Sequence, residues 1–270
     1  MILNETLQQI QTLYGGKLDG IRIDRIIIGL FFTGVELSNG FGGVGYTPTA
    51  DLHGVACCSS MAVESHAPVR LKGLPVTELL NWKGSSPLTD VVKLVVMNAL
   101  SAPFLNEENY RIVYDADALD LIDLCSAGKI GMVGAFVPFL KRFKVMEGID
   151  LSVVEQKKDS LKTDEMQFYV PAEQASVVLP ACDTVIITGA SIANGTIDDL
   201  LSFTRPGATV IVTGPTASML PDALFQKNAS IVSGVEVTDT DKALDLLAEG
   251  AGAYRLFTDA CVRKINILKG

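Results

Sequence analysis

Glycines and polar side chains recur where short apolar runs end in the C-terminal half of the sequence. Such runs end before Gly134, Gly189 and Gly214, and another ends on Glu155. In an open parallel sheet the carboxyl ends of the strands share one edge, and small molecules bind beyond that edge. The spacing therefore predicts a small-molecule site there. The candidate ligand-binding residues are Gly134, Phe136, Glu155, Gly189, Ser191, Asn194, Thr196, Gly214, Thr216, Ser218 and Asn98.

The loop after the first run does not match a dinucleotide fingerprint. Counting from Gly134, Phe136 and Phe139 stand where the second and third glycines of that fingerprint would be. A phenylalanine there keeps a diphosphate away from the backbone, so we expect neither NAD nor NADP to bind tightly. Glu155 follows Gly134 by about twenty residues, which is the sequence separation at which an acid accepts hydrogen bonds from a ribose in such folds. The alternative for the Gly134 loop is a plain glycine turn. The alternative for Glu155 is a solvated charge at a strand end.

The loop that begins at Gly189 is rich in small polar residues. Thr196 and Asp199 have the spacing of a capping box and predict the start of a helix. Free N–H groups at such a start attract an anion or a polar heterocycle. Because capping alone explains Thr196, the functional hypothesis rests on Ser191 and Asn194. The loop after Gly214, with Thr216 and Ser218, repeats this spacing, and a plain turn is its alternative.

Two features of the N-terminal half have weaker functional interpretations. Asn98 falls on the apolar face of an expected helix, so its amide either braces a neighbouring loop or points into a cleft. The other feature is a set of side chains that a soft metal prefers: His53, Cys57, Cys58 and His66. Adjacent cysteines rarely close a tetrahedral site and no Cys-x-x-Cys pair accompanies them. We therefore expect no metal site made by this set.

Composition excludes several classes of partner. The net charge of −9 argues against a non-specific grip on nucleic acid or on an anionic membrane. Apolar runs such as Ile26–Phe32 are too short to span a bilayer, and no signal peptide is visible at Met1. The five cysteines are an odd number, which suits reduced thiols better than a disulfide framework. A cytoplasmic location is expected.

The N-terminal half predicts a small α+β domain over residues 1–110. Three strands rich in β-branched and aromatic residues would form an antiparallel meander, with a tight turn at Asn39-Gly40. The glycine-rich stretch Gly40–Gly45 predicts either a bulge or the close approach of another backbone or a ligand. The expected strands are Ile21–Ile28, Leu30–Ser38 and Phe41–Thr47, and the expected helices are Asn4–Tyr14, Pro75–Trp82 and Ser86–Ala102.

Residues 111–270 predict an α/β domain in which short apolar strands alternate with helices. Continuously apolar strands are typical of a parallel sheet that is covered on both faces. The expected strands are Lys129–Val133, Leu151–Glu155, Thr184–Thr188, Thr209–Thr213 and Ser230–Val235. The expected helices are Ala116–Ser126, Pro138–Phe143, Pro171–Leu179, Thr196–Phe203, Pro221–Phe225 and Asp241–Ala248.

The order of these segments resembles a family of proteins described as putative heavy-metal chelation proteins. The matching segments are Ile28–Ser38, Met97–Leu100, Gly131–Gly134, Thr188–Ser191 and Asn194–Thr196. The resemblance implies an α/β fold, in which an enolase-N-terminal-like α+β domain precedes a Rossmann-like, mainly parallel sheet domain. It also implies a role around heavy metals, such as making or handling a chelating small molecule. The Rossmann-like part resembles those of methyltransferases, which suggests an S-adenosylmethionine-like, nucleotide or pterin-like ligand.

Two functional hypotheses follow. In the first, the protein is an enzyme that acts on a polar heterocyclic or nucleotide-like molecule in a cleft between the domains, in metal-chelator synthesis or breakdown. No nucleophile–base triad or carboxylate pair is recognisable, so no catalytic residue is assigned. In the second, it is a non-catalytic binding protein for a metal or a metal complex. The N-terminal domain would supply one wall of the cleft; the alternative is that it covers a hydrophobic edge or forms a homodimer contact.

Overall fold

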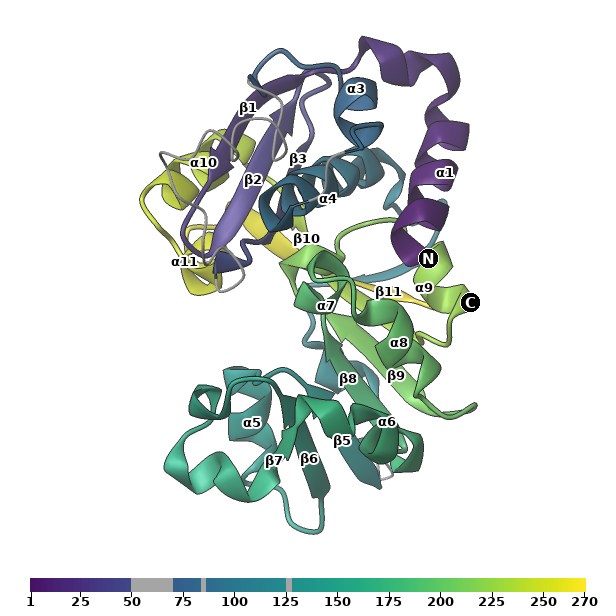
Figure 1. The fold of residues 1–270 in the computed structure, drawn as a ribbon, viewed down its shortest axis with the longest axis vertical. Coiled ribbons are helices and arrows are strands. Elements are labelled where there is room, and N and C mark those ends of the chain that lie inside the picture. Colours follow the sequence, from purple (N-terminus) through teal and green to yellow (C-terminus); the bar gives the residue numbers. More distant parts are fainter. Residues whose placement is uncertain (50–69, 84–85, 125–127) are drawn as a thin grey trace.

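The structure, a computed structural model, describes residues 1–49, 70–83, 86–124 and 128–270. It is an α/β protein with a three-stranded sheet and an eight-stranded sheet. The small sheet lies at one end of the elongated molecule, and strand β7 (Tyr169–Pro171) of the large sheet lies towards the other end (Figure 1). Within the described residues, no helix has the length and apolar character that crossing a membrane requires.

The small sheet is the antiparallel meander that the sequence predicts. Its strands β1, β2 and β3 pair in that order, and Gly40 has a φ of 84° in the turn between β2 and β3. The N-cap of the following long helix is Ser86, whose Oγ accepts a hydrogen bond from the Thr89 N–H. The elements are α1 (Ile2–Tyr14), η1 (Gly15–Gly20), β1 (Ile23–Ile28), β2 (Phe32–Leu37), β3 (Gly42–Tyr46), α3 (Val76–Leu80), α4 (Pro87–Ser101) and η3 (Ala102–Phe104).

The large sheet has the order β4-β11-β10-β9-β8-β5-β6-β7. Strands β5 to β10 are parallel to one another, and β11 is antiparallel to both of its neighbours, β10 and β4. The prediction of a mainly parallel sheet is therefore confirmed. The strands are β4 (Arg111–Tyr114), β5 (Lys129–Val133), β6 (Asp150–Glu155), β7 (Tyr169–Pro171), β8 (Thr184–Thr188), β9 (Thr209–Thr213), β10 (Ile231–Val237) and β11 (Val262–Leu268).

The order of these strands reverses between β5 and β8. From β5 the chain runs outward through β6 and β7, then returns to the other side of β5 and continues through β8, β9 and β10. The helices that follow or connect these strands are α5 (Val137–Phe143), α6 (Ala175–Val178), α7 (Ala190–Ala193), α8 (Ile197–Ser202), α9 (Asp222–Gln226), α10 (Thr240–Ala248) and α11 (Ala253–Thr258). Such a reversal opens a crevice beyond the carboxyl ends of the strands.

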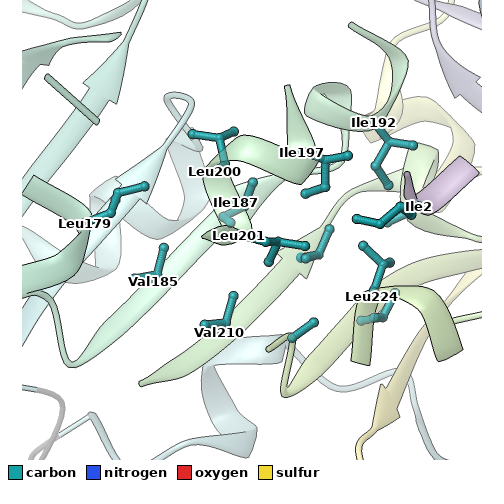
Figure 2. Close-up of a cluster of buried hydrophobic side chains, with 14 of the residues drawn as sticks. Ile2, Leu179, Val185, Ile187, Ile192, Ile197, Leu200, Leu201, Val210 and Leu224 are labelled. Carbon is teal, nitrogen blue, oxygen red and sulfur yellow. The ribbon is translucent and has the colours of Figure 1, made fainter. Parts of the chain in front are cut away.

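Both faces of the large sheet are buried, as continuously apolar strands require. On one face Val185 and Ile187 of β8 pack with residues of α6, α8 and α9, together with Ile2 of α1 (Figure 2). On the other face Ile186 packs with α5 and with the short turn η4 (Ala118–Leu121). Successive β8 side chains thus enter opposite cores.

The small sheet is also covered on both faces, by α4 on one side and α10 on the other. The glycines of β3 allow this packing. A Cβ on Gly43 would lie 2.2 Å from the Val95 carbonyl oxygen of α4, and one on Gly42 would lie 2.6 Å from Thr240 Oγ1 of α10. Of the alternatives for the glycine-rich stretch, the structure has the close approach of another backbone.

Helix α1, at the start of the sequence, contacts α8 and α9 of the C-terminal half. The Ile2 N–H lies 3.3 Å from both carboxylate oxygens of Asp198. Asp222 Oδ2 accepts hydrogen bonds from Gln9 Nε2 at 2.8 Å and from the Tyr110 hydroxyl at 2.6 Å. Burial, together with the neighbouring Asp222, raises the pKa of the Tyr110 hydroxyl, which therefore remains a donor. Helix α1 packs on α9, and α10 packs on the small sheet, so segments from both sides of residue 110 contact each other. The domain boundary near residue 110 therefore stays a prediction.

Two expected helices differ from the structure, and further elements are not predicted by the sequence patterns. The helix expected over Ala116–Ser126 is wrong for its described residues, 116–124: these form only η4, because Asp117 accepts a hydrogen bond from the Leu119 N–H and favours a tight turn. The helix expected over Pro171–Leu179 is broken into η8 (Ala172–Gln174), α6 and η9 (Leu179–Ala181). Strands β4, β7 and β11 and helix α11 were not predicted.

We expect Gly43→Ala to lower the free energy of unfolding by about 3 kcal/mol, because its Cβ would collide with backbone that cannot swing away. Urea denaturation measures this change. The control is Gly16→Ala, where an added Cβ meets nothing within 4 Å. Equal stabilities of the two variants would contradict the packing described for α4 and β3.

Candidate functional site

A cleft of about 810 Å³ lies at the carboxyl ends of the parallel strands. Its lining includes the ends of β5 and β8, which flank the reversal in strand order, the end of β6, and residues of η8, α7 and α8. Tyr46 and Pro48, at the end of β3, also line it. The cleft therefore has walls from both the large sheet and the small one.

Six of the residues that the sequence predicts line this cleft: Gly134, Phe136, Glu155, Ser191, Asn194 and Thr196. They come from three separate loops that the parallel strands bring to one edge. Ligand binding by these residues stays a prediction.

Glu155, the last residue of β6, is fixed by the backbone around it. Its Oε2 accepts a hydrogen bond from the Ala135 N–H at 3.1 Å, and its Oε1 accepts one from the Lys157 N–H at 3.1 Å. The Gly134 N–H donates to the Val154 carbonyl at 3.0 Å, which joins the β5 loop to β6. An ionised carboxylate has about four acceptor positions, so Glu155 retains capacity for a ligand.

Phe136 lies where a dinucleotide site has its second glycine. Its ring stacks on that of Phe139 with 5.4 Å between the centroids, and part of it lines the cleft. Gly134, with a φ of 90°, turns the chain so that the loop folds back over β6. This geometry is the physical basis for the expectation that NAD and NADP bind weakly, which stays a prediction.

The loop between α7 and α8 holds its own shape. Asn194 Oδ1 accepts hydrogen bonds from the Thr196 N–H at 3.1 Å and from its hydroxyl at 2.7 Å, and Ser191 Oγ donates to the Thr188 carbonyl at 2.6 Å. The predicted capping box is wrong, because the Thr196 side chain makes no hydrogen bond to the first turn of α8. The hydroxyl is held by Asn194 instead.

Five predicted residues lie outside the cleft lining, in the junction between the sheets. Asn98 Nδ2 donates to the Val44 carbonyl at 2.9 Å and to the Thr216 carbonyl at 3.3 Å, so it braces the turn η10 (Pro215–Ala217). Thr216 Oγ1 accepts from the Tyr46 N–H at 3.0 Å, and Ser218 Oγ accepts from the Val235 N–H at 2.8 Å. Gly189 and Gly214 begin the two loops that meet here. All of these polar side chains are buried.

The lining also contains residues that were not among the predicted ligand contacts, among them Tyr46, Pro48, Glu173 and Asp199. Tyr46 and Pro48 arrive through the packing of the small sheet, which no local pattern encodes. Glu173 follows the unpredicted strand β7. Asp199 fits a helix-capping pattern, which gives it a structural role and no reason to expect it in the cleft wall.

Metal ligation by side chains alone finds no support in the described part of the chain. No group of three or more histidine, cysteine, aspartate or glutamate residues there could hold a metal ion. His53, Cys57, Cys58 and His66 lie outside the described residues. The described residues thus do not fit a metal centre made by protein side chains alone.

Comparison with known proteins then places the chain. Two family models, both described as "Putative heavy-metal chelation", match residues 12–101 and residues 117–266. The chain belongs to this family. The resemblance found in the sequence is thereby confirmed, although the family description specifies neither a reaction nor a substrate.

Individual relatives agree with this membership. An uncharacterised protein of Methanocaldococcus jannaschii is 26% identical over 189 residues, which cover 68% of each chain. Two solved structures of family members of unknown function share the fold. The protein from Pyrococcus horikoshii has a TM-score of 0.78 at 20% identity and covers 100% of both chains. The protein from Desulfitobacterium hafniense has a TM-score of 0.68 at 22% identity, over 97% of this chain and 99% of that one.

We expect Asn98→Ala to lower the free energy of unfolding by about 1–3 kcal/mol, because it leaves buried carbonyl oxygens of β3 and η10 without their donor. Thermal unfolding measures the loss. Asn109→Ala is the matched control, since its amide donates to the Phe104 carbonyl at the exposed surface. A loss no greater than that of the control would show that Asn98 does not brace the junction.

Proposed function

We propose that the cleft binds a polar heterocyclic or nucleotide-like small molecule, and that the protein is an enzyme of metal-chelator synthesis or breakdown. The observation that carries the proposal is the position of the cleft, beyond the strand ends at the reversal in strand order. Ligands of Rossmann-like sheets bind at this point. A volume of about 810 Å³ suits a ligand of nucleoside size or larger.

Each wall supplies a different kind of contact in this proposal. Glu155 accepts hydrogen bonds from a ribose or an amine, since two backbone donors already fix its carboxylate. Asn194 is exposed on the opposite wall and orients the polar edge of the heterocycle. The half-buried ring of Tyr46 packs on the flat face of the ligand.

The second candidate is a binding protein that takes up a metal already held by an organic chelator and catalyses nothing. The family description and the carboxylates of the cleft favour it. Metal analysis of the purified protein, combined with mass spectrometry of whatever is released on unfolding, separates the two candidates. A stoichiometric metal with its chelator, and no turnover of that complex, would favour the second.

The main proposal is tested by filling the cleft. Titration calorimetry with adenosine, S-adenosylmethionine and pterin should give binding of at least one of them to the intact protein. Ala172→Trp, in the lining, should abolish it. Ala181→Trp should leave binding unchanged, because Ala181 lies in η9, before the amino end of β8. Unchanged binding in Ala172→Trp would place the ligand elsewhere.

The contribution of the small sheet has its own expected result. Tyr46→Ala should weaken the binding of the ligand identified by that titration about tenfold, because stacking on an aromatic ring contributes about 1–3 kcal/mol. Calorimetry on the full-length variant measures this loss. Tyr254→Ala, which truncates an 80% exposed tyrosine on α11, is the control. If both variants bound as tightly as the native chain, the large sheet would hold the ligand alone.

A further inference from the structure

The charged side chains of the cleft are mainly acidic. Among the described residues, its lining contains the carboxylates of Glu155, Glu173 and Asp199 and a single cation, Lys157. These carboxylates come from β6, η8 and α8, which are separate elements around the cleft. Lys157 is exposed and follows β6. A ligand in the cleft therefore meets net negative charge from several directions.

The β5 loop, which receives the diphosphate in dinucleotide-binding sheets, has its donors in use here. The Gly134 N–H bonds the Val154 carbonyl, and the Phe136 N–H bonds the Gly134 carbonyl at 3.1 Å. Between them, the Ala135 N–H bonds Glu155 Oε2. The place of an anion is thus taken by a carboxylate of the protein itself.

Donors of the facing loop are engaged in the same way. The Gly189 N–H bonds the Thr213 carbonyl at 2.7 Å, and the Ala190 N–H bonds Thr188 Oγ1 at 3.3 Å. Both donors of Thr196 bond Asn194 Oδ1. The carboxylates of Glu173 and Asp199, by contrast, are exposed. These carboxylates therefore remain available to a ligand, whereas the backbone donors named above are not available to an anion.

We propose that the cleft selects a cationic ligand, a nucleoside whose substituent carries an ammonium or sulfonium group, and rejects phosphorylated nucleosides. This inference rests on the proposed function and adds the sign of the charge to it. An opposite charge near the carboxylates stabilises the complex, whereas a phosphate would be repelled by Glu155 and its neighbours. Discrimination against the phosphate comes from this repulsion and from the engagement of the backbone donors of the β5 loop by the protein itself.

The test uses three probes that share the adenine and the sugar. They are 5′-amino-5′-deoxyadenosine, which is cationic, adenosine, which is neutral, and adenosine 5′-monophosphate, which is anionic. Calorimetry on the intact protein should give affinities in that order, with at least tenfold between the first and the last. Added salt should narrow the gap, because it screens the carboxylates.

Two variants locate the origin of the preference. Glu155→Gln and Asp199→Asn should each reduce the ratio of amine to phosphate affinity several-fold while changing adenosine binding less. Asp199→Asn guards against a disturbed loop, since the Asp199 side chain is exposed. The control is Glu147→Gln, which removes the same charge at an exposed position before β6, at the opposite edge of the sheet.

The outcomes separate the two proposals. Equal binding of all three probes would overturn the charge selection and leave the nucleoside site standing. Tighter binding of the phosphate would overturn it as well. Failure of all three probes at millimolar concentration would overturn the nucleoside site and the charge selection together.

Discussion

The contact between α4 and β3 is the constraint on which the arrangement of the two sheets depends. The helix approaches the strand so closely that Gly43 must lack a side chain. This proximity carries the Asn98 amide to the Val44 carbonyl and to the turn η10. A buried amide that donates to two elements at once costs free energy if either one moves. The small sheet is thereby held to the strand ends of the large one.

The wall of the cleft that contains Tyr46 is a consequence of this junction. The Tyr46 N–H bonds Thr216 Oγ1 in the same turn that Asn98 braces. On the far side of the small sheet, Gly34 lies against Leu244 and Leu247 of α10, so the sheet is clamped between helices from distant parts of the sequence. These contacts bring a strand of the small sheet to the cleft at the strand ends of the large one.

Local patterns predict those parts of the fold that local physics decides. The bounds of β8 and β9 match the prediction, because each is a buried apolar run that ends at a glycine. Strand β11 escaped because Arg263, Lys264 and Asn266 interrupt its apolar residues, and its partner β4 lies far away in the sequence. The position of the cleft could be predicted from the strand ends, but the full set of residues that line it could not. Tyr46 and Glu173 reach it through tertiary packing alone.

The polar loops show why residue type leaves two roles unresolved. Serine, threonine and asparagine at a strand end are suited both to contact a ligand and to hold the turn that carries them. Here the second role absorbs much of their capacity, as Asn194 does in accepting both donors of Thr196. The groups that can contact a ligand are those that hydrogen bonds within the fold leave free. In this cleft that remainder is largely carboxylate, because each backbone donor used within a loop removes a partner for an anion and leaves the acidic side chains in excess.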